Sequence, residues 1–220
     1  MVKKEERAAA ESPRERYRAQ VRAEIKEHAW QQVATAGASA LSLNAIAKRM
    51  GMSGPALYRY YASRDDLITE LVKEAYRSLA DTLHDTAATG ADLRALAHTL
   101  RDWALEDPHR YLLVYGTPVP GYHAPDDVTG VSDAIMKTLL DACTAALAAR
   151  PVAPPAPGFL AGHREWAAGH PAPPAALRLA LAFWTRLHGV LSLELAGHFA
   201  GMGFDPALLF TAELDDLAPR

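Results

Sequence analysis

The stretch from residue 51 to residue 61, GMSGPALYRYY, places three tyrosines and an arginine behind a glycine, a serine and a proline. Tyrosine hydroxyls and guanidinium groups commonly donate hydrogen bonds to phosphate oxygens. Small residues at the start of a helix allow its free backbone N–H groups to approach an anion or a base edge closely. The composition of this stretch is therefore typical of a surface that contacts a nucleic-acid backbone and reaches into a groove.

Helices must position such a surface, and the first is predicted well upstream of it. Ile25, Ala29 and Val33 recur at four-residue spacing and predict a helix from about residue 14 to residue 36. Gly37 follows, where a left-handed C-terminal cap is expected.

Two short helices are predicted next. Ser42, a favoured N-cap residue, precedes a helix of about two turns that ends at Gly51. Ser53 is placed to cap a third helix, and Pro55 falls in its first turn, where a missing N–H group has no partner to lose. Two short helices separated by a tight turn form a helix-turn-helix, whose later helix enters the DNA major groove.

The third helix has two kinds of aromatic position. Leu57 and Tyr61 are four residues apart and are predicted to pack inward. Tyr58, Arg59 and Tyr60 then point toward solvent, because consecutive residues on a helix face different directions and cannot all be core. We interpret Tyr61 as a packing residue, and Tyr58 and Tyr60 as phosphate contacts.

The rest of the chain also has helical periodicity, and no useful β-alternation occurs, so the predicted fold class is all-α. Ser63 is expected to cap a long connector helix that starts at about residue 64. Residues 117–127 are predicted to be a loop, and seven prolines mark residues 150–174 as an irregular connection. Further helices are predicted over residues 93–105, 108–115, 131–149, 176–199 and 205–217.

The bulk composition limits the classes of protein. Half of the 220 residues are hydrophobic, which is enough for a sizeable core. No apolar run approaches the roughly 20 residues of a membrane span, and the charged N-terminus lacks an apolar signal segment, so a cytoplasmic location is expected. Cys143 is the single cysteine, which excludes an intrachain disulfide, and its apolar surroundings indicate a buried bystander rather than a nucleophile.

Charge is distributed unevenly along the chain. Residues 1–64 hold 12 Lys and Arg against 6 Asp and Glu, whereas residues 65–220 hold 11 against 20. A basic first third joined to an acidic remainder is what a two-part protein shows when only its first part meets phosphates.

The run LSLNAIAKRMGMSGPALYRYYASRDDL resembles the DNA-binding domain of the tetracycline-repressor (TetR) family of bacterial transcriptional regulators. The likeness lies in the IA pair, the turn of glycine, apolar residue and serine, the LY pair of the recognition helix, and the start of the connector. It covers about residues 18–75. The resemblance implies a helix-turn-helix domain over residues 14–62 behind a disordered tail at 1–13, and a connector helix with a helical C-terminal domain over 63–220.

The resemblance also assigns DNA contacts by position. It implies that Ser42 caps its helix against a phosphate, that residues 53–56 face the bases, and that Arg64 braces the DNA backbone. Many family members carry Lys or Arg where this chain has Gly54, so a larger share of the specificity is expected to fall to Asn44, Arg59 or DNA shape. The predicted DNA-binding residues are Ser42, Asn44, Ser53, Gly54, Pro55, Ala56, Tyr58, Arg59, Tyr60 and Arg64.

The C-terminal part resembles the Trp-His-Gly type of TetR domain, in which a helix with the pattern W-x-x-x-H-G precedes one last helix. Trp184 and His188 share a helix face, and Gly189 permits close helix approach. Core and dimer packing is the alternative to a ligand role for all three. The predicted ligand-binding residues, aromatic walls with polar tips, are Trp103, Tyr111, Tyr115, Tyr122, Trp184 and His188, with Trp166 as a further wall.

The resemblance implies a homodimer that pairs through its last two helices and binds a palindromic operator in double-stranded DNA. It implies a repressor that a small hydrophobic or aromatic ligand releases, and no cofactor. The alternative is a helix-turn-helix regulator without a small-molecule ligand, which responds to a protein partner or acts as an activator.

An enzyme is the competing class, and the sequence disfavours it. No Gly-rich phosphate loop, HExxH motif or GxSxG motif occurs. His188, Glu194 and His198 suggest a metal site, but the two histidines lie about 280° apart around a helix, so one face cannot hold both. Glu194 and His198 do share a face, and two ligands do not make a site.

Overall fold

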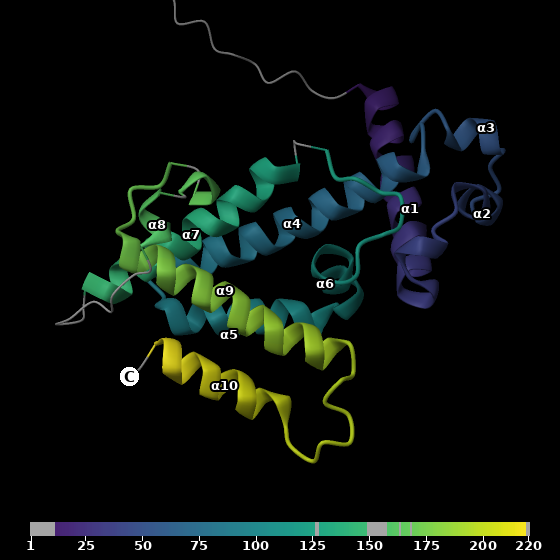
Figure 1. Ribbon diagram of the computed structural model, residues 1–220. Helices are drawn as coiled ribbons and strands as arrows, with labels where there is room; N and C mark the ends of the chain where they lie inside the picture. The colour runs from purple at the N-terminus through teal and green to yellow at the C-terminus, as the bar shows by residue number, and fades with distance from the viewer. Residues whose placement is uncertain (1–11, 126–127, 149–157, 163, 168, 219–220) are drawn as a thin grey trace, which may run out of the picture. The chain divides into compact units, whose positions relative to one another are not determined.

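The computed structural model describes residues 12–125, 128–148, 158–162, 164–167 and 169–218. Within these ranges the regular elements are helices and no strand occurs, so the predicted all-α class is confirmed (Figure 1). The chain divides into two compact units, residues 1–71 and residues 72–220. In the described part of the chain, no helix is long and apolar enough to cross a membrane.

The first unit begins with α1 (Pro13–Ala36), whose start is fixed by its sequence. Ser12 Oγ accepts a hydrogen bond from the Glu15 backbone N–H, and the Glu15 carboxylate accepts one from the Ser12 N–H at 2.8 Å. This capping box satisfies two of the N–H groups that the first turn of a helix leaves unpaired. The unit continues with the 3-10 helix η1 (Ala38–Ala40), α2 (Leu43–Arg49), α3 (Gly54–Leu57) and the first part of α4 (Arg64–Ala88).

One stripe of α1 is buried, and it includes the predicted Ile25, Ala29 and Val33. Gly37 ends the helix with φ 77° and ψ 161°. The positive φ agrees with the prediction, but the extended ψ does not, so the expected left-handed cap is absent at this residue. The chain therefore leaves α1 in an extended direction before it forms η1.

A single glycine determines the tight turn between α2 and α3. The Met52 N–H donates to the Ala47 carbonyl oxygen at 2.9 Å, and the Gly51 N–H donates to that of Lys48 at 3.3 Å. This pair of bonds is a Schellman motif, which requires a positive φ at the residue after the helix, and Gly51 has φ 67°. A residue without a Cβ adopts this conformation at no steric cost.

α3 is shorter than predicted. Tyr58 is its C-cap, and the Tyr60 N–H donates to the Leu57 carbonyl oxygen at 2.8 Å in the turn that follows. Tyr58, Arg59 and Tyr60 therefore lie on a turn rather than within a regular helix. Leu57 and Tyr61 are buried on either side of that turn, as predicted.

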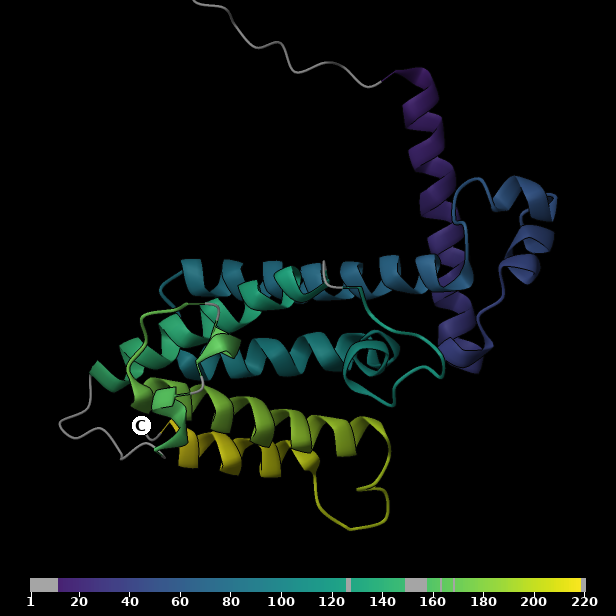
Figure 2. The same ribbon diagram turned by 45° about the horizontal axis from the view of Figure 1, so that its top comes forward.

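The second unit is a bundle of helices in which α9 is central, because α9 packs against α5, α6, α7, α8 and α10. Figures 1 and 2 both show α10 running alongside α9. Aspartate side chains cap three of its helices by accepting backbone N–H bonds in the first turn. Besides the later part of α4, its helices are α5 (Leu93–Glu106), α6 (Pro108–Tyr115), α7 (Thr129–Ala148), α8 (Phe159–Gly162), η3 (Glu165–Ala167), α9 (Pro174–Leu195) and α10 (Pro206–Leu217).

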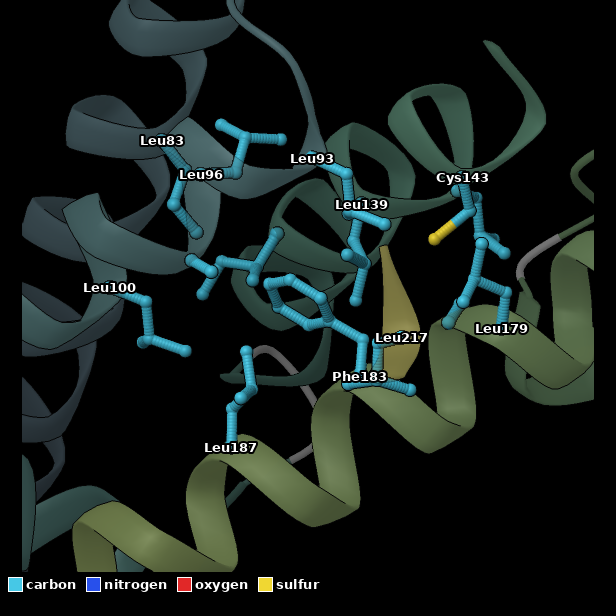
Figure 3. Packing of buried hydrophobic residues seen from close by; sticks show 14 of the residues in the cluster. Leu83, Leu93, Leu96, Leu100, Leu139, Cys143, Leu179, Phe183, Leu187 and Leu217 are labelled. Carbon is cyan, nitrogen blue, oxygen red and sulfur yellow. The ribbon is translucent and has the colours of Figure 1, made fainter. Parts of the chain in front are cut away.

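The core of this unit is apolar and closely packed. Figure 3 shows the ring of Phe183, from α9, among leucines that include Leu100 of α5 and Leu139 of α7. Burying such a side chain contributes about 1.5–3 kcal/mol. Cys143 lies in the same cluster, and burial raises the pKa of its thiol to about 12, so the thiol stays protonated and the predicted buried role is confirmed.

Several predicted boundaries can be compared with the structure. Of the tail predicted at 1–13, residues 1–11 lie outside the described residues, whereas Ser12 and Pro13 start α1. Residues 117–125 are free of helix, as expected for the loop. Of the connection at 150–174, residues 150–157, 163 and 168 lie outside the described residues, and the remainder holds α8, η3 and the first residue of α9. The helix predicted over 176–199 ends earlier, at Leu195.

Candidate nucleic-acid interface and effector site

Arginines of α1 hold the backbone of the turn after α3. The guanidinium of Arg22 lies 4.4 Å from the centroid of the buried Tyr61 ring and donates to the Tyr60 carbonyl oxygen at 2.9 Å. Arg18, one turn earlier, donates to the Arg59 carbonyl oxygen at 3.4 Å. Sequence reasoning missed Arg22, because its partners are 38 or more residues away along the chain.

The predicted contact residues of this segment are accessible to different degrees. Tyr58 is 45% exposed, Arg59 is exposed and Tyr60 is half-buried. Among the four residues predicted to face the bases, Ser53 and Pro55 are exposed. The other two, Gly54 and Ala56, are half-buried. Hydroxyl and guanidinium groups therefore lie on one accessible stretch of chain.

Asn44 occupies space that a side chain at residue 54 would need. Its Oδ1 lies 3.3 Å from the position that a Cβ would take on Gly54, which is tighter than most real Cβ contacts. Because Asn44 is exposed, its amide is available beside the start of α3. An Asn amide can form a bidentate pair with adenine in the major groove.

Ser42 and Arg64 serve the scaffold in the structure. Ser42 Oγ accepts from the Ala45 N–H at 3.3 Å, as predicted for an N-cap, and its hydroxyl hydrogen remains free to donate. The Arg64 guanidinium donates to the carbonyl oxygens of Leu41 at 3.2 Å and Ala38 at 3.0 Å. Arg64 therefore ties η1 and the residue after it, Leu41, to the start of α4, and its predicted phosphate contact stays a prediction.

Lys48 is a further cation that sequence reasoning did not select. It is exposed in the last turn of α2, four residues after Asn44 and thus on the same helix face. That spacing is the signal that could have identified it.

Aromatic rings form a cluster inside the second unit, contributed by α4, α6 and α9. The His188 ring centroid lies 4.1 Å from that of Trp184 and 4.4 Å from that of Tyr115. Tyr115 also packs against Tyr76 at 5.9 Å and Tyr111 at 5.2 Å. We call these five residues the aromatic cluster. Four of them were predicted as ligand-binding residues, and Tyr76 was missed.

Hydrogen bonding within the aromatic cluster is incomplete. Tyr111 Oη lies 2.9 Å from His188 Nδ1 and 3.0 Å from Ser192 Oγ. Tyr115 Oη and His188 Nε2 are buried, and no described residue offers either atom a hydrogen-bond partner.

Burial controls the ionisation of the cluster. It lowers the pKa of His188 to about 3 and raises that of Tyr111 to about 12. The pKa of Tyr115 is also raised by burial, and that of Tyr76 is raised by burial and by the nearby Tyr122. The imidazole and the phenols named here are therefore uncharged at neutral pH.

Two hollows lie near the aromatic cluster. A small apolar cavity of about 10 Å³ has Trp184 and Phe183 in its wall. An open groove of about 620 Å³ runs between α4 and α7, and its lining is mostly alanine with Asp81, His84, Lys137 and Asp141. Thr138 lines both hollows.

The remaining predicted ligand residues lie apart from the cluster or at its margin. Trp103 donates from Nε1 to Ser78 Oγ at 3.1 Å, and the Arg110 guanidinium lies 4.5 Å from its ring centroid. Tyr122 is half-buried in the loop after α6, close enough to affect the ionisation of Tyr76. Trp166 of η3 packs at the edge of the hydrophobic core.

The residues considered for a metal site have other roles. Glu194 pairs with Arg101 through two hydrogen bonds, one of them at 2.8 Å. His198 lies beyond the end of α9, so the shared helix face expected for Glu194 and His198 is not formed. Among the described residues, no three His, Cys, Asp or Glu side chains are grouped as metal ligands.

Comparison with known proteins supplies independent findings. A family model described as bacterial regulatory proteins, tetR family, matches residues 25–71. A second, described as a tetracyclin repressor-like C-terminal domain, matches residues 93–217. The HTH-type transcriptional regulators Rv1816 of Mycobacterium tuberculosis (strain ATCC 25618 / H37Rv) and Mb1846 of Mycobacterium bovis are each 37% identical over 212 residues, which cover 89% of this chain and 90% of the relative.

Solved structures are also similar. A crystal structure of the candidate regulatory protein SCO4313 has a TM-score of 0.86 and 64% sequence identity, and the match covers 95% of this chain and all of that one. A protein of unknown function from Rhodococcus sp. RHA1 has a TM-score of 0.68 at 23% identity, with 97% of each chain covered, which shows a shared fold.

Proposed function

The chain belongs to the TetR family of DNA-binding transcriptional regulators, which are not enzymes, and we propose that it is a homodimeric repressor released from a palindromic operator by a small hydrophobic or aromatic ligand. Its partner is double-stranded DNA, which in a bacterium is in the cytoplasm. The observation that supports this best is the accessible group of polar side chains around α3, held in place by buried and hydrogen-bonded neighbours.

Asn44 supplies the base contact beside Gly54, and the exposed groups around it contact phosphates. Tyr58 and Arg59 are exposed on the turn after α3, and Lys48 follows Asn44 on α2. Base contacts set sequence preference, whereas phosphate contacts set position and much of the affinity. Half-buried Tyr60 and the N-cap Ser42 contribute hydroxyl groups, and Arg64 positions the unit from within.

The dimer pairs through α9 and α10. These helices and the turn between them carry exposed apolar side chains, with Leu208 67% exposed and Met202 61% exposed. No described residue lies within 4 Å of the place that a Cβ would take on Gly189, so the close helix approach predicted there is open to a second copy of the chain. An isologous interface presents two recognition segments, and its operator is palindromic for that reason. The other exposed apolar residues of this region are Leu193 and Phe204.

Ligand binding in the second unit releases DNA by a population shift. α4 is continuous from Arg64 to Ala88, so a single helix joins the DNA-contacting unit to the unit that holds the aromatic cluster. In one conformation of the dimer, the spacing of the two recognition segments does not fit the operator. A ligand that binds this conformation more tightly increases its population, and the dimer then dissociates from DNA.

Footprinting on the DNA upstream of the chain's own gene tests the proposal. We expect protection of a palindromic site, weaker protection with Tyr58→Ala, and unchanged protection with Tyr17→Ala, a matched change at an exposed tyrosine of α1. Protection that has no sequence preference, or equal protection by both variants, contradicts the proposal.

A regulator without a small-molecule ligand is the second candidate, because the described apolar cavity beside Trp184 is far smaller than the roughly 300 Å³ of a typical ligand site. Thermal melting distinguishes the two, since a ligand that binds only the folded state raises the melting temperature. Intact DNA binding without any shift across a library of aromatic compounds favours the second candidate.

A further inference from the structure

Two polar atoms in the aromatic cluster have no hydrogen-bond partner among the described residues. Tyr115 Oη and His188 Nε2 are buried, and His188 is only 8% exposed as a residue. A buried donor or acceptor without a partner costs free energy, and such groups are uncommon in native proteins. The rings of these two residues pack against each other, with centroids 4.4 Å apart, so both unpartnered atoms belong to one cluster.

The hydrogen bonds of Tyr111 determine whether a bound molecule must donate or accept a hydrogen bond at His188 Nε2. The Tyr111 hydroxyl has one hydrogen. It donates this hydrogen either to His188 Nδ1 at 2.9 Å, or to another acceptor, which is the His188 carbonyl oxygen at 3.3 Å or Ser192 Oγ at 3.0 Å. In the first case His188 Nε2 carries a hydrogen, and in the second it is a bare acceptor. A ligand hydroxyl satisfies both cases, because it donates and accepts.

The surroundings favour a flat, uncharged ligand body. Aromatic rings prefer edge-to-face or offset contacts with other rings, and the rings of Tyr76, Tyr111 and Trp184 pack against those of Tyr115 and His188. A charged ligand would be desolvated there beside neutral groups, because burial keeps the His188 imidazole and the Tyr115 phenol uncharged. A neutral aromatic ligand avoids this cost.

We propose that Tyr115 Oη and His188 Nε2 form the polar end of the effector site, and that the effector is an uncharged planar aromatic molecule with a hydroxyl group. This inference rests on the proposed function, because it assigns the ligand class of the same site. Burial keeps the His188 imidazole and the Tyr115 phenol neutral, in agreement with the hydroxyl as the group that both recognise.

Space for the ligand body comes from movement of Trp184. Its indole lies between the aromatic cluster and the apolar cavity of about 10 Å³, which is too small for an aromatic ring. Displacing the indole joins the cavity to the cluster. Thr138 lines both that cavity and the open groove between α4 and α7.

Three naphthalene probes test the ligand class on the full-length protein. Naphthol, methylnaphthalene and naphthoate, substituted at the same ring position, have similar sizes and differ as a neutral hydroxyl, an apolar group and an anion. We expect naphthol to bind at least about tenfold more tightly than either of the others, as measured by calorimetry, because the site pairs with a hydroxyl. Equal affinities, tighter binding of naphthoate, or no binding of naphthol overturns the inference.

A Tyr115→Phe variant assigns the effect to the proposed atom. It removes one unpartnered hydroxyl and leaves the ring, so the protein remains folded, and the preference for naphthol over methylnaphthalene is expected to shrink by about tenfold. Tyr17→Phe, on α1, is the matched control and keeps the full preference. An unchanged preference in Tyr115→Phe contradicts the assignment.

DNA binding is measured separately, so that the two proposals fail independently. If the ligand-free protein does not bind an operator specifically, the proposed function is contradicted, regardless of the affinity for naphthol. Specific operator binding together with equal affinities for the three probes overturns the ligand class alone.

Discussion

Asn44 Oδ1 lies 3.3 Å from the point where a Cβ on Gly54 would stand, so the two residues share one small space at the start of α3. A Cβ at residue 54 would require the Asn44 amide to move by a few tenths of an ångström, so a longer side chain there competes with Asn44 for this space. The glycine at residue 54 thus leaves the space that the Asn44 amide occupies.

Asn44→Ala is expected to remove one base contact. Affinity for the operator should fall by about 1–3 kcal/mol, while affinity for unrelated DNA stays the same, because phosphate contacts are unaffected. Fluorescence anisotropy with both DNAs measures the two affinities. Gly54→Lys should also change the preferred sequence, because the lysine displaces Asn44. Parallel losses on both DNAs in Asn44→Ala would instead make residue 44 a phosphate contact.

Arg64 should act mainly through the scaffold. Because its guanidinium donates to the carbonyl oxygens of Leu41, Ala38 and Ser39, Arg64→Ala is expected to lower the free energy of unfolding by about 1–3 kcal/mol and to weaken operator binding with it. Arg64→Lys keeps the charge but not the fork of donors, so it should restore neither property fully. Urea unfolding and anisotropy measure both. Full recovery of DNA binding by lysine, with stability unchanged in both variants, would indicate a simple phosphate contact.

The local pattern of the sequence was sufficient for most helices. Ser42 and Ser63 cap their helices as predicted, and the four-residue stripe of α1 is buried as its spacing predicts. Ser53 precedes α3 as predicted, but its side chain makes no capping hydrogen bond. The length of α3 was not predictable in this way, because the turn that carries Tyr58 and Arg59 is held by Arg18 and Arg22 of α1.

In the candidate effector site, too, some features follow from the local sequence pattern and others depend on residues distant in the sequence. The helical spacing that places Trp184 and His188 on one face also brings Tyr111 and Tyr115 of α6 onto one face. Trp103 was also predicted to bind the ligand, but in the folded unit it contacts Ser78 and Arg110 instead of joining the aromatic cluster. Non-local contacts therefore decided which aromatic residues meet.

Leu208→Glu should weaken the dimer. Leu208 is 67% exposed on α10, and a charge at an apolar interface between copies would be desolvated without a partner. Sedimentation velocity should show a shift toward monomer at micromolar concentration. Leu105→Glu, at an exposed leucine of α5, is the control and should remain dimeric. If both variants sediment with the same dimer mass as the unmodified chain, the assignment of α10 to the interface is wrong.

His188 should make stability depend on pH. Its pKa is lowered by burial from 6.5 to about 3, so the unfolded chain takes up a proton on this imidazole at a higher pH than the folded chain does. The free energy of unfolding therefore falls as pH falls from about 6.5 toward 3. Between pH 7 and pH 4.5 this contribution is about 3 kcal/mol. Urea unfolding at both values should show a smaller loss for His188→Phe than for the unmodified chain.

A matched change at an exposed histidine separates this effect from general acid destabilisation. His84→Gln alters a side chain on the surface of α4, so its loss of stability should equal that of the unmodified chain. Equal losses in the unmodified chain and in His188→Phe would show that His188 is not the group that titrates.

The central claim is that the first unit recognises a specific DNA sequence. It is tested most directly by the affinity of the purified protein for the DNA upstream of its own gene and for unrelated DNA, at two salt concentrations. We expect binding to the upstream DNA to be at least about a thousandfold tighter, and both affinities to fall as salt rises, because cations at the interface release counterions from DNA. Equal, weak affinity for both DNAs at either salt concentration would contradict the account.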